Sequence, residues 1–268
     1  MCRLLGYLGS PIQLDQLLYK PEHSLIVQSY QPKEMTSGVV NADGLGIGWY
    51  DSTPDIKPFT YKNTLPIWND INLPELSRYV QSGCMLAYVR SATPGQALDL
   101  SNCQPFRRDR LLAIHNGFIK NFRKTLYRPI RDRLSDEIYQ SIHGTTDSEH
   151  IFALFVNQLC RFPDSTIEQA LYATLTTLTE ITQAYETSIS ANLIITDGSH
   201  LVASRYGCNT TAPTLYWLRD DPSYPNAVII ASEPLFTGHW HTFPENSLIS
   251  VSKSLDVQIN QLLYSISS

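Results

Sequence analysis

The sequence predicts a domain of the α+β class, in which strands and helices are grouped rather than alternating. Apolar runs typical of strands occupy the chain up to residue 118 and return after residue 190. The stretch between them carries apolar residues at helical spacing. Strands followed by helices favour an α+β layered domain over a βαβ arrangement. With 268 residues, 43% of them hydrophobic and 17% charged, the chain can bury a sizeable core.

Four apolar runs in the first part of the chain are predicted strands. The second run follows Asp43-Gly44, a dipeptide that favours a tight turn. The third and fourth runs stop abruptly at polar residues. The four runs are SLIVQSY (24–30), GLGIGWY (44–50), CMLAYVRSAT (84–93) and RLLAIHNGF (110–118).

Four helices are predicted in the middle of the chain, over residues 118–127, 129–144, 145–160 and 165–181. The first must end or kink at Pro129, where the second restarts before closing on Gly144. The third begins with a capping box formed by Thr146 and Glu149. The fourth places apolar side chains on one face: Ile167, Leu171, Leu175 and Leu178.

Further strands are predicted at the C-terminal end. ANLIIT (191–196) and HLVASRY (200–206) are joined by Asp197-Gly198-Ser199, which indicates a hairpin. NAVIIASEPL (226–235) is another strand. No repeat or linker divides the chain, so a single domain over residues 1–268 is expected.

Charge and hydropathy exclude several classes of protein. The net charge of −5 gives no electrostatic reason to expect a nucleic-acid partner. No apolar run approaches the roughly 20 residues of a membrane helix. The opening MCRLLGYLGSPIQ has one arginine and too short an apolar stretch for a signal peptide. We therefore expect a cytoplasmic protein that binds no membrane.

The cysteine and histidine residues do not indicate a metal or disulfide framework. The five cysteines are odd in number, widely spaced and never arranged as CxxC. The seven histidines include no HExxH motif, and the HWH at 239–241 needs more ligands than are visible. No metal and no cofactor are expected, and Cys84 and Cys103 are predicted to be small buried hydrophobic residues.

Cys2 has two possible roles, depending on whether Met1 is removed. If Met1 stays, Cys2 is an ordinary thiol near a frayed chain end. If Met1 is removed, the thiol lies beside a free α-amine whose pKa of about 7.7–8.0 is low for an amine. Such an amine can take the thiol proton and later return it to a leaving group. The dipeptide alone does not decide between the two.

The segment AIHNGF contains a possible oxyanion hole. Asn116-Gly117 is predicted where a strand ends and a helix begins. A carboxamide donor beside a glycine N–H is suited to stabilising an oxyanion, and glycine allows a substrate to approach the backbone. The alternative is a plain Asn-Gly turn. His115 is interpreted as a support of the strand end rather than a catalytic residue.

Two charged residues could bind a zwitterionic substrate. Arg90 follows an apolar strand and could hold a carboxylate through two parallel hydrogen bonds, or could form a structural ion pair. Asp147 lies in the first turn of a predicted helix. It could bind an ammonium group, or simply favour the helix N-terminus.

Taken together and in order, these motifs resemble the class II glutamine amidotransferases of the N-terminal nucleophile hydrolase superfamily. The resemblance covers nearly the whole chain. It is closest to the stand-alone members, and among those to the γ-glutamyl hydrolases of ergothioneine biosynthesis and then to relatives in glutathione degradation. The matching segments are Met1–Arg3, Asn41–Tyr50, Val89–Thr93, Asn102–Phe106, His115–Gly117, Thr146–Glu149 and Ser232–Leu235.

The resemblance implies a four-layer αββα sandwich with Cys2 at the open end of one sheet. It implies that Cys2 of the processed chain is the nucleophile and that Asn116 and Gly117 form the oxyanion hole. Arg90 and Thr93 would hold the α-carboxylate of a small γ-glutamyl substrate, and Asp147 its α-ammonium. Hydrolysis through a Cys2 glutamyl-thioester is the implied reaction.

One departure from the family pattern concerns the leaving group. Many amidotransferases have Arg-Trp-Ala-Thr-His-Gly, whereas this chain has Ser91 and Pro94 in place of the tryptophan and histidine. A pocket for a larger γ-glutamyl conjugate is therefore expected. An alternative from the same superfamily is a choloylglycine-type acylase, which also starts at a cysteine. Such an enzyme would not need Asp147 to hold an ammonium group. A glutaminase subunit that supplies ammonia to a synthase partner, a silent regulatory subunit and a homo-oligomer stay open as alternatives.

Overall fold

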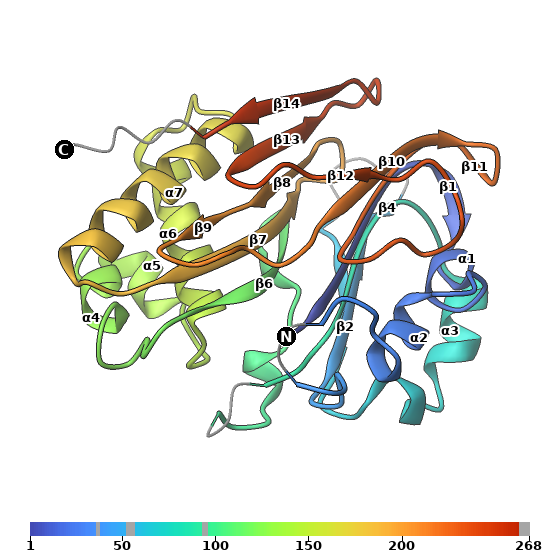
Figure 1. Ribbon diagram of the computed structural model, residues 1–268, viewed down its shortest axis with the longest axis horizontal. Helices are drawn as coiled ribbons and strands as arrows, with labels where there is room; N and C mark the ends of the chain where they lie inside the picture. The colour runs from blue at the N-terminus through green and yellow to red at the C-terminus, as the bar shows by residue number, and fades with distance from the viewer. Residues whose placement is uncertain (36–37, 52–56, 93–95, 263–268) are drawn as a thin grey trace.

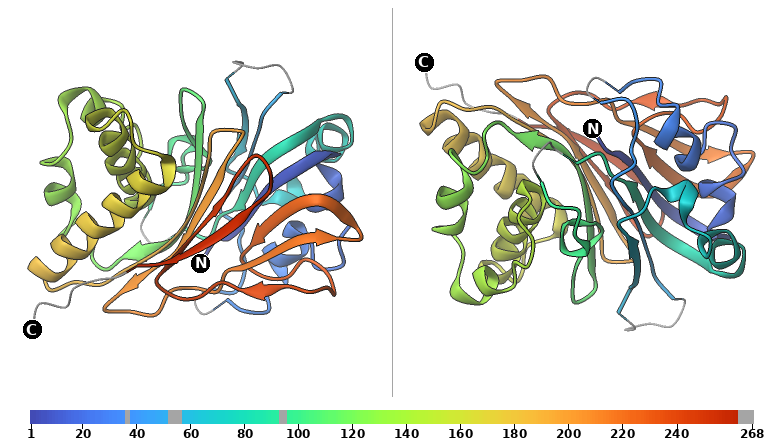
Figure 2. Two further views of the ribbon diagram at one scale, coloured as in Figure 1. Left: turned by 90° about the horizontal axis from the view of Figure 1, so that it is seen from above. Right: turned by 90° about the horizontal axis from the view of Figure 1, so that it is seen from below.

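Two antiparallel β-sheets face each other in the computed structural model, and helices cover both outer faces (Figures 1 and 2). The structure describes residues 1–35, 38–51, 57–92 and 96–262. The four layers are therefore helices, sheet, sheet and helices, which confirms the predicted α+β class and the αββα sandwich.

The first sheet has seven strands, with the N-terminal strand at its centre. From one edge to the other they are β12 (His241–Thr242), β10 (Tyr216–Asp221), β11 (Tyr224–Ala231), β1 (Arg3–Gln13), β4 (Gln81–Val89), β2 (Leu45–Trp49) and β3 (Phe59–Asn63). Strand β1 pairs with β11 on one side and with β4 on the other. The start of the chain is thus held between the first and the last third of the sequence.

The second sheet carries the predicted oxyanion segment on one of its inner strands. Its order is β14 (Val257–Gln261), β13 (Ser247–Val251), β8 (Leu201–Arg205), β7 (Ile189–Thr196), β6 (Leu111–Ile119) and β5 (Phe106–Arg108), with β9 (Gly207–Cys208) paired to β7. Strands β6 and β7 are antiparallel over their whole shared length.

Helices of different length cover the two sheets. On the first sheet lie α1 (Asp15–Leu18), α2 (Leu25–Tyr30) and α3 (Leu73–Tyr79), with a 3₁₀ turn η1 (Ile67–Asn69). On the second lie α4 (Tyr127–Arg131), α5 (Asp136–Gln140), α6 (Asp147–Arg161) and α7 (Ile167–Ala184). A second 3₁₀ turn, η2 (Leu100–Asn102), precedes β5. Within the described part of the chain, no helix is long and apolar enough to cross a membrane.

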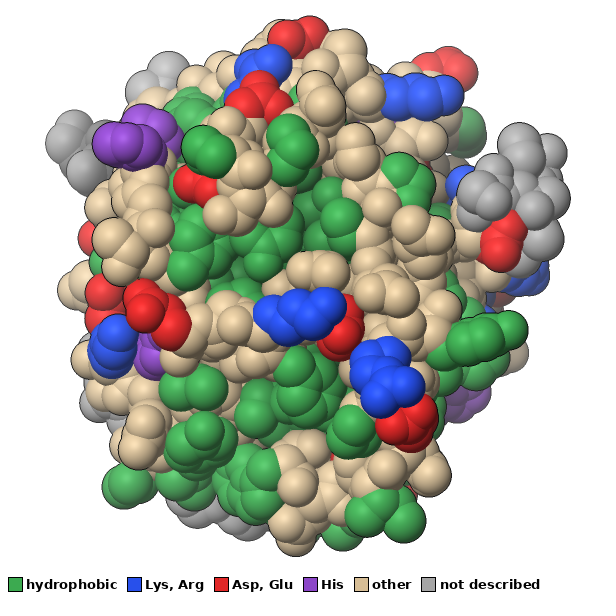
Figure 3. All heavy atoms as spheres, turned by 90° about the vertical axis from the view of Figure 1, so that its right-hand side faces the viewer, with side chains coloured by type: hydrophobic (Ala, Val, Ile, Leu, Met, Phe, Trp, Pro, Cys, Tyr) green, Lys and Arg blue, Asp and Glu red, His purple; other side chains and the backbone are tan. Residues whose placement is uncertain are grey.

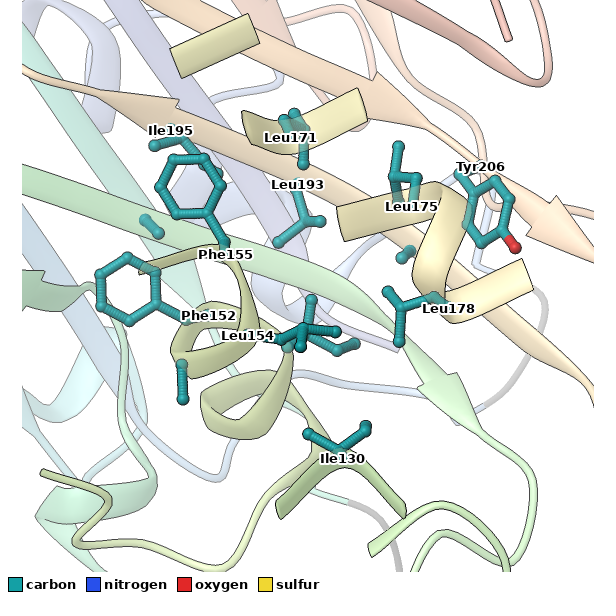
Figure 4. Packing of buried hydrophobic residues seen from close by; sticks show 14 of the residues in the cluster. Ile130, Phe152, Leu154, Phe155, Leu171, Leu175, Leu178, Leu193, Ile195 and Tyr206 are labelled. Carbon is teal, nitrogen blue, oxygen red and sulfur yellow. The ribbon is translucent and has the colours of Figure 1, made fainter. Parts of the chain in front are cut away.

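Three hydrophobic cores hold the four layers together. Alternation along β1 divides its side chains: Leu4 and Leu8 enter the core between the sheets, whereas Leu5 and Tyr7 pack beneath α1–α3. The largest core lies between the second sheet and α4–α7. Figure 4 shows side chains of α6 and α7 meeting β7 there: Phe152, Phe155, Leu171, Leu175, Leu193 and Ile195.

The face that carries α1 and α3 mixes hydrophobic side chains with charged ones. Figure 3 shows Lys and Arg side chains lying beside Asp and Glu on this face. Two such pairs are Lys20 with Asp15 and Arg78 with Glu75, at 3.1 and 3.4 Å. Both side chains of the Arg78–Glu75 pair are exposed, so this pair stabilises the fold little, whereas Asp15 is buried.

Some predicted elements are wrong. Residues 24–30 form a helix rather than a strand, because Ser24 caps it and Leu25 packs beneath the first sheet. Residues 120–126 form turns, since Asn121 has a left-handed φ of 54° that an α-helix does not allow. The predicted helix over 129–144 is two short helices, α4 and α5.

The longer elements are confirmed. Helices α6 and α7 extend a few residues beyond the predicted ends, and the other predicted strands are present. At the start of α6, Thr146 Oγ1 accepts a hydrogen bond from Glu149 N at 3.2 Å, but the Glu149 carboxylate turns to the N–H groups of His143 and Gly144. The complete capping box lies at the start of α7 instead, between Thr166 and Gln169.

Candidate active site

Cys2 lies immediately before the central strand of the first sheet. Its side chain is half-buried and packs against the core between the sheets. The thiol Sγ is 3.8 Å from the carbonyl oxygen of Ser91, which follows the end of β4. Tyr88 is also adjacent, and its pKa is raised well above the usual value, mainly by burial and further by Cys2. The thiol therefore lies where β1 begins and β4 ends, as the family resemblance implies.

The chain end beside Cys2 is well suited to hold a neutral amine. Burial lowers the pKa of the Met1 α-amine, and the nearby guanidinium of Arg3 lowers it further. Cys2 and Asp43 oppose the shift without cancelling it. A lowered pKa leaves a larger fraction of such an amine unprotonated at neutral pH, and only the unprotonated form can accept a proton.

A buried carboxylate fixes the residues that follow Cys2. Arg3 points to the opposite face of the sheet from Cys2, and its Nη1 lies 3.1 Å from Glu233 Oε1. Glu233 also accepts hydrogen bonds from His23 Nε2 at 2.7 Å and from the N–H groups of Lys33 and Glu34 at 2.8 and 3.1 Å. One carboxylate thus joins the N-terminal strand to the segment that precedes residue 35.

Ser232 adds two hydrogen bonds to the same strand. Its Oγ accepts from Leu4 N at 2.9 Å, and its own N–H donates to Leu4 O at 3.0 Å. Chain ends usually fray, so these contacts explain how a terminal residue can be placed accurately. Sequence reasoning gave Ser232 and Glu233 no role, although both lie in a segment that carries the family resemblance.

The pKa of Glu233 links this network to acid stability. Burial by itself would raise that pKa, but the bonds from His23, Lys33 and Glu34 and the charge of Arg3 lower it overall. A carboxylate with a lowered pKa stabilises the fold above its ordinary pKa of about 4.3, and this contribution disappears as the pH falls through the lower folded value.

We therefore expect Glu233→Gln to lower the free energy of unfolding at pH 7, with the deficit shrinking as the pH falls below about 4. Thermal denaturation followed by circular dichroism from pH 3 to pH 7 measures this. Glu75→Gln, which removes an exposed carboxylate, is the control. A deficit for Glu233→Gln that is equal at all pH values would contradict the assignment.

Arg90 directly follows β4 and is only 2% exposed. Its Nη2 donates to Gln96 Oε1 at 3.2 Å, and its Nη1 lies 3.5 Å from the carbonyl oxygens of Asp43 and Ala97. Among the described residues, no carboxylate lies within ion-pair distance of it. The structural ion pair considered as an alternative is therefore not found in this part of the chain, and the buried cation is available for an anionic ligand.

Asp147 is the first residue of α6, as predicted, and is 8% exposed. Its Oδ2 accepts from Ile119 N at 2.8 Å and its Oδ1 from Ser148 N at 2.9 Å. No ion pair with Lys or Arg is found for it in the described ranges. The carboxylate is oriented by the backbone and keeps lone pairs for a cationic group.

Asn116 and Gly117 lie within β6, which continues to Ile119 rather than ending at them. β6 thus extends one residue beyond the strand predicted over 110–118, and the Asn-Gly turn is excluded. Asn116 is 1% exposed, and within the described ranges neither its Oδ1 nor its Nδ2 has a hydrogen-bond partner. Buried amides are normally paired, so an unpaired one in this position suits a donor that awaits a ligand.

Gly117 allows close packing between strands. A Cβ at this position would lie 2.0 Å from the carbonyl oxygen of Ser190 and 2.7 Å from His115 Nε2. His115 itself points toward the helices, where its Nδ1 lies 2.8 Å from Ser148 Oγ. Burial lowers the pKa of His115, with Asp147 opposing the shift. This placement agrees with the predicted supporting role of His115.

Asn102 connects the two charged residues through the backbone. Its Nδ2 donates to Ala97 O at 3.2 Å, in the segment that contacts Arg90. Its Oδ1 accepts from Thr145 N at 2.8 Å, two residues before Asp147. The cation and the anion are therefore held on segments that are tied together.

Other residues singled out in the sequence are Thr93, Pro94, the HWH segment and two cysteines. Thr93 and Pro94 lie outside the described residues. The HWH segment places His241 against Trp217, with ring centroids 4.6 Å apart. The described ranges contain no group of three His, Cys, Asp or Glu residues that could hold a metal ion. Cys84 and Cys103 are buried, as predicted.

Known proteins share both this sequence pattern and this architecture. A family model described as "Glutamine amidotransferases class-II" matches residues 1–231. "Probable glutamine amidotransferase DUG3" of Saccharomyces cerevisiae is 31% identical, with 94% of this chain and 82% of that protein covered. A "Gamma-glutamyl-hercynylcysteine sulfoxide hydrolase" of Mycolicibacterium smegmatis is 29% identical, with 94% and 96% covered.

Solved structures agree on the fold. A glutamine aminotransferase class-II domain protein of Silicibacter pomeroyi superposes with a TM-score of 0.71 at 24% identity, covering 98% of this chain and all of the other. Glutamine phosphoribosylpyrophosphate amidotransferase of B. subtilis gives a TM-score of 0.67 at 17% identity, and the match covers 98% of this chain but only 50% of that larger protein. From the extent of the family match, the chain belongs to the class II glutamine amidotransferases.

Proposed function

We propose that the mature chain begins at Cys2 and hydrolyses a γ-glutamyl amide bond through a glutamyl-thioester. The observation that carries this proposal is the pair of buried charges, Arg90 and Asp147, each without an oppositely charged side chain in the described part of the protein. A γ-glutamyl group presents one α-carboxylate and one α-ammonium, and this pair matches both. Thr93 is proposed to assist Arg90.

The proposed reaction uses the α-amine of Cys2 as its base. The amine takes the thiol proton, and the thiolate sulfur attacks the γ-carbonyl carbon. The oxygen then carries a negative charge, which Asn116 Nδ2 and the Gly117 N–H are proposed to stabilise. The protonated amine gives its proton to the leaving nitrogen as the C–N bond breaks. Water attacks the thioester next and loses a proton to the amine. The C–S bond then breaks, glutamate is released, and the protonated amine returns its proton to the sulfur, which restores the thiol.

The leaving group is proposed to be larger than ammonia. Ser91 replaces the bulky tryptophan of many amidotransferases, which removes about 150–250 Å² of potential contact surface. The relative from Mycolicibacterium smegmatis is named for a γ-glutamyl-hercynylcysteine sulfoxide substrate. A γ-glutamyl-cysteinyl conjugate of a histidine betaine is therefore the proposed substrate, and the proposed location is the cytoplasm.

Kinetics on two substrates test this specificity. All γ-glutamyl amides share the carboxylate, ammonium and oxyanion contacts, so only the leaving-group pocket can discriminate among them. We expect kcat/KM for the bulky conjugate to exceed that for free glutamine by at least about tenfold, which corresponds to about 1.4 kcal/mol. Release of glutamate measures both rates. Equal or faster cleavage of glutamine would instead favour a subunit that supplies ammonia to a synthase partner.

A further inference from the structure

Two buried asparagines face each other across β6 and β7. Asn116 and Asn192 are register partners in this antiparallel pair. Both side chains point into the layer between the sheets, because Ile114 and Ile194, two residues away on the same strands, belong to that core. Asn116 is 1% exposed and Asn192 is fully buried. Cβ atoms of such partners lie about 4.5–5.5 Å apart, so the two amide groups are neighbours.

The amide of Asn192 can have only one orientation. Its Nδ2 donates to Pro213 O at 2.9 Å and to Thr214 O at 3.2 Å, which uses both amide hydrogens. In the part of the chain that the structure describes, its Oδ1 has no hydrogen-bond partner. Turning the amide over would place its oxygen against two carbonyl oxygens. Asn192 therefore presents a fixed and free acceptor on the face that it shares with Asn116.

The amide of Asn116 has no such constraint from other groups. Among the described residues, neither of its polar atoms has a hydrogen-bond partner, so the two amides are not hydrogen-bonded to each other in this structure. The nearby acceptor on Asn192 favours the orientation in which Nδ2, rather than Oδ1, is turned toward it. A carboxamide nitrogen carries two hydrogens, so a rotation of the Asn116 side chain that brings Nδ2 within hydrogen-bond distance of Asn192 Oδ1 leaves the second hydrogen for another acceptor.

We infer that Asn192 is a positioning residue that selects the amide orientation of Asn116. This inference rests on the proposed function, in which Asn116 Nδ2 donates to the oxyanion. In the opposite orientation, Oδ1 of Asn116 would face the oxyanion and repel it. Asn192 acts only through Asn116 and does not touch the substrate.

The same hydrogen bonds connect this amide pair to the nucleophile strand. Thr214, whose carbonyl accepts from Asn192, donates its Oγ1–H to Ser232 O at 3.1 Å. Ser232 in turn bonds to Leu4, two residues after Cys2. These hydrogen bonds therefore fix the orientation of Asn192 relative to β1, the strand that Cys2 directly precedes.

A double-mutant cycle tests the inference. The variants are Asn116→Ala, Asn192→Ala and the two combined, each assayed for kcat and KM on the best γ-glutamyl substrate. Rates are expressed per active site, by titrating Cys2 with an electrophilic glutamine analogue. Loss of an oxyanion donor typically lowers kcat by about 10²–10³-fold, and this is expected for Asn116→Ala. Asn192→Ala should lower kcat by about tenfold, because only part of the donor population is then misoriented, with KM unchanged within about twofold.

The decisive comparison is the effect of Asn192→Ala in two backgrounds, the otherwise unchanged protein and the Asn116→Ala variant. If Asn192 acts through Asn116, Asn192→Ala has no effect on kcat in the Asn116→Ala background. A tenfold loss in both backgrounds would overturn the inference, because a general structural role costs the same in each. An Asn116→Ala variant with unchanged kcat would instead refute the oxyanion role of Asn116 in the proposed function.

Asn157→Ala is the matched control. Asn157 is another buried asparagine, on α6, whose amide bonds to Ser135 N and Arg133 O rather than to any residue of the proposed site. Its replacement should lower the melting temperature without changing kcat per active site. If Asn192→Ala does not fold, Asn192→Ser enters the same cycle and is judged by the same comparison.

Discussion

Replacement of Cys2 by alanine is expected to abolish turnover, with a fall in kcat of more than about 10³-fold, while the fold is retained. In the proposed mechanism the Cys2 thiol forms the thioester, so without it residual hydrolysis would have to come from a water molecule. The side chain is half-buried at the start of β1, and Arg3 and Leu4 hold the strand independently of it. Thermal denaturation followed by circular dichroism should therefore give a free energy of unfolding within about 1 kcal/mol of that of the unchanged protein.

Two measurements and one control variant accompany this variant. Intact mass should show that the mature protein begins at Cys2, and an electrophilic glutamine analogue should add once, at that residue. Cys160→Ala is the control, because Cys160 is the exposed thiol and is remote from the site in the sequence. Labelling at Cys84, Cys103, Cys160 or Cys208, or an active protein that keeps Met1, would refute Cys2 as the nucleophile.

Arg90→Ala and Asp147→Ala should each reduce kcat/KM by about tenfold to more than a hundredfold. Each residue is proposed to make a charge-assisted hydrogen bond worth roughly 1.5–3 kcal/mol, and both side chains are buried, where water screens such bonds little. Because both contacts are to the glutamyl group, the loss should be the same for every γ-glutamyl substrate. Steady-state kinetics on at least two substrates with different leaving groups measures this.

Arg78→Ala and Asp136→Ala serve as charge-matched controls, because both side chains are exposed and lie outside the proposed site. They should leave kcat/KM unchanged. A loss for Arg90→Ala that is confined to one leaving group would place Arg90 on the other side of the scissile bond. The same outcome for Asp147→Ala would remove it from the ammonium site.

The sequence predicts elements well where the signal is local and long. Helix α7 spans 18 residues with an apolar face, so its periodicity is unambiguous. SLIVQSY is too short for that test, and an apolar run of this length suits either a strand or a helix. Ser24 decides in favour of the helix, since its side chain accepts from Val27 N.

The candidate site was predicted in part for the same reason. Cys2, Arg90, Asn116 and Asp147 stand next to recognisable motifs, and the structure places each at a strand end, on an inner strand or at a helix start. The roles of Glu233, which lies in a matching segment, and of Asn192, which does not, could not be found in this way. Their roles depend on contacts with Arg3 and Asn116, which are far away in the sequence and become neighbours only when the two sheets form.

The central position of β1 also has a consequence for biosynthesis. Gly9 and Leu5 pair with Ala227 and Ala231, and Leu4 is held by Ser232. A ribosome releases these partners long after β1 has emerged, so the first strand to be made is fixed only late. The nascent N-terminus stays open to an aminopeptidase throughout this interval. In the proposed enzyme, this interval allows the methionine to be removed before the strand is buried, and the growing chain cannot attack γ-glutamyl metabolites until β11 has been made.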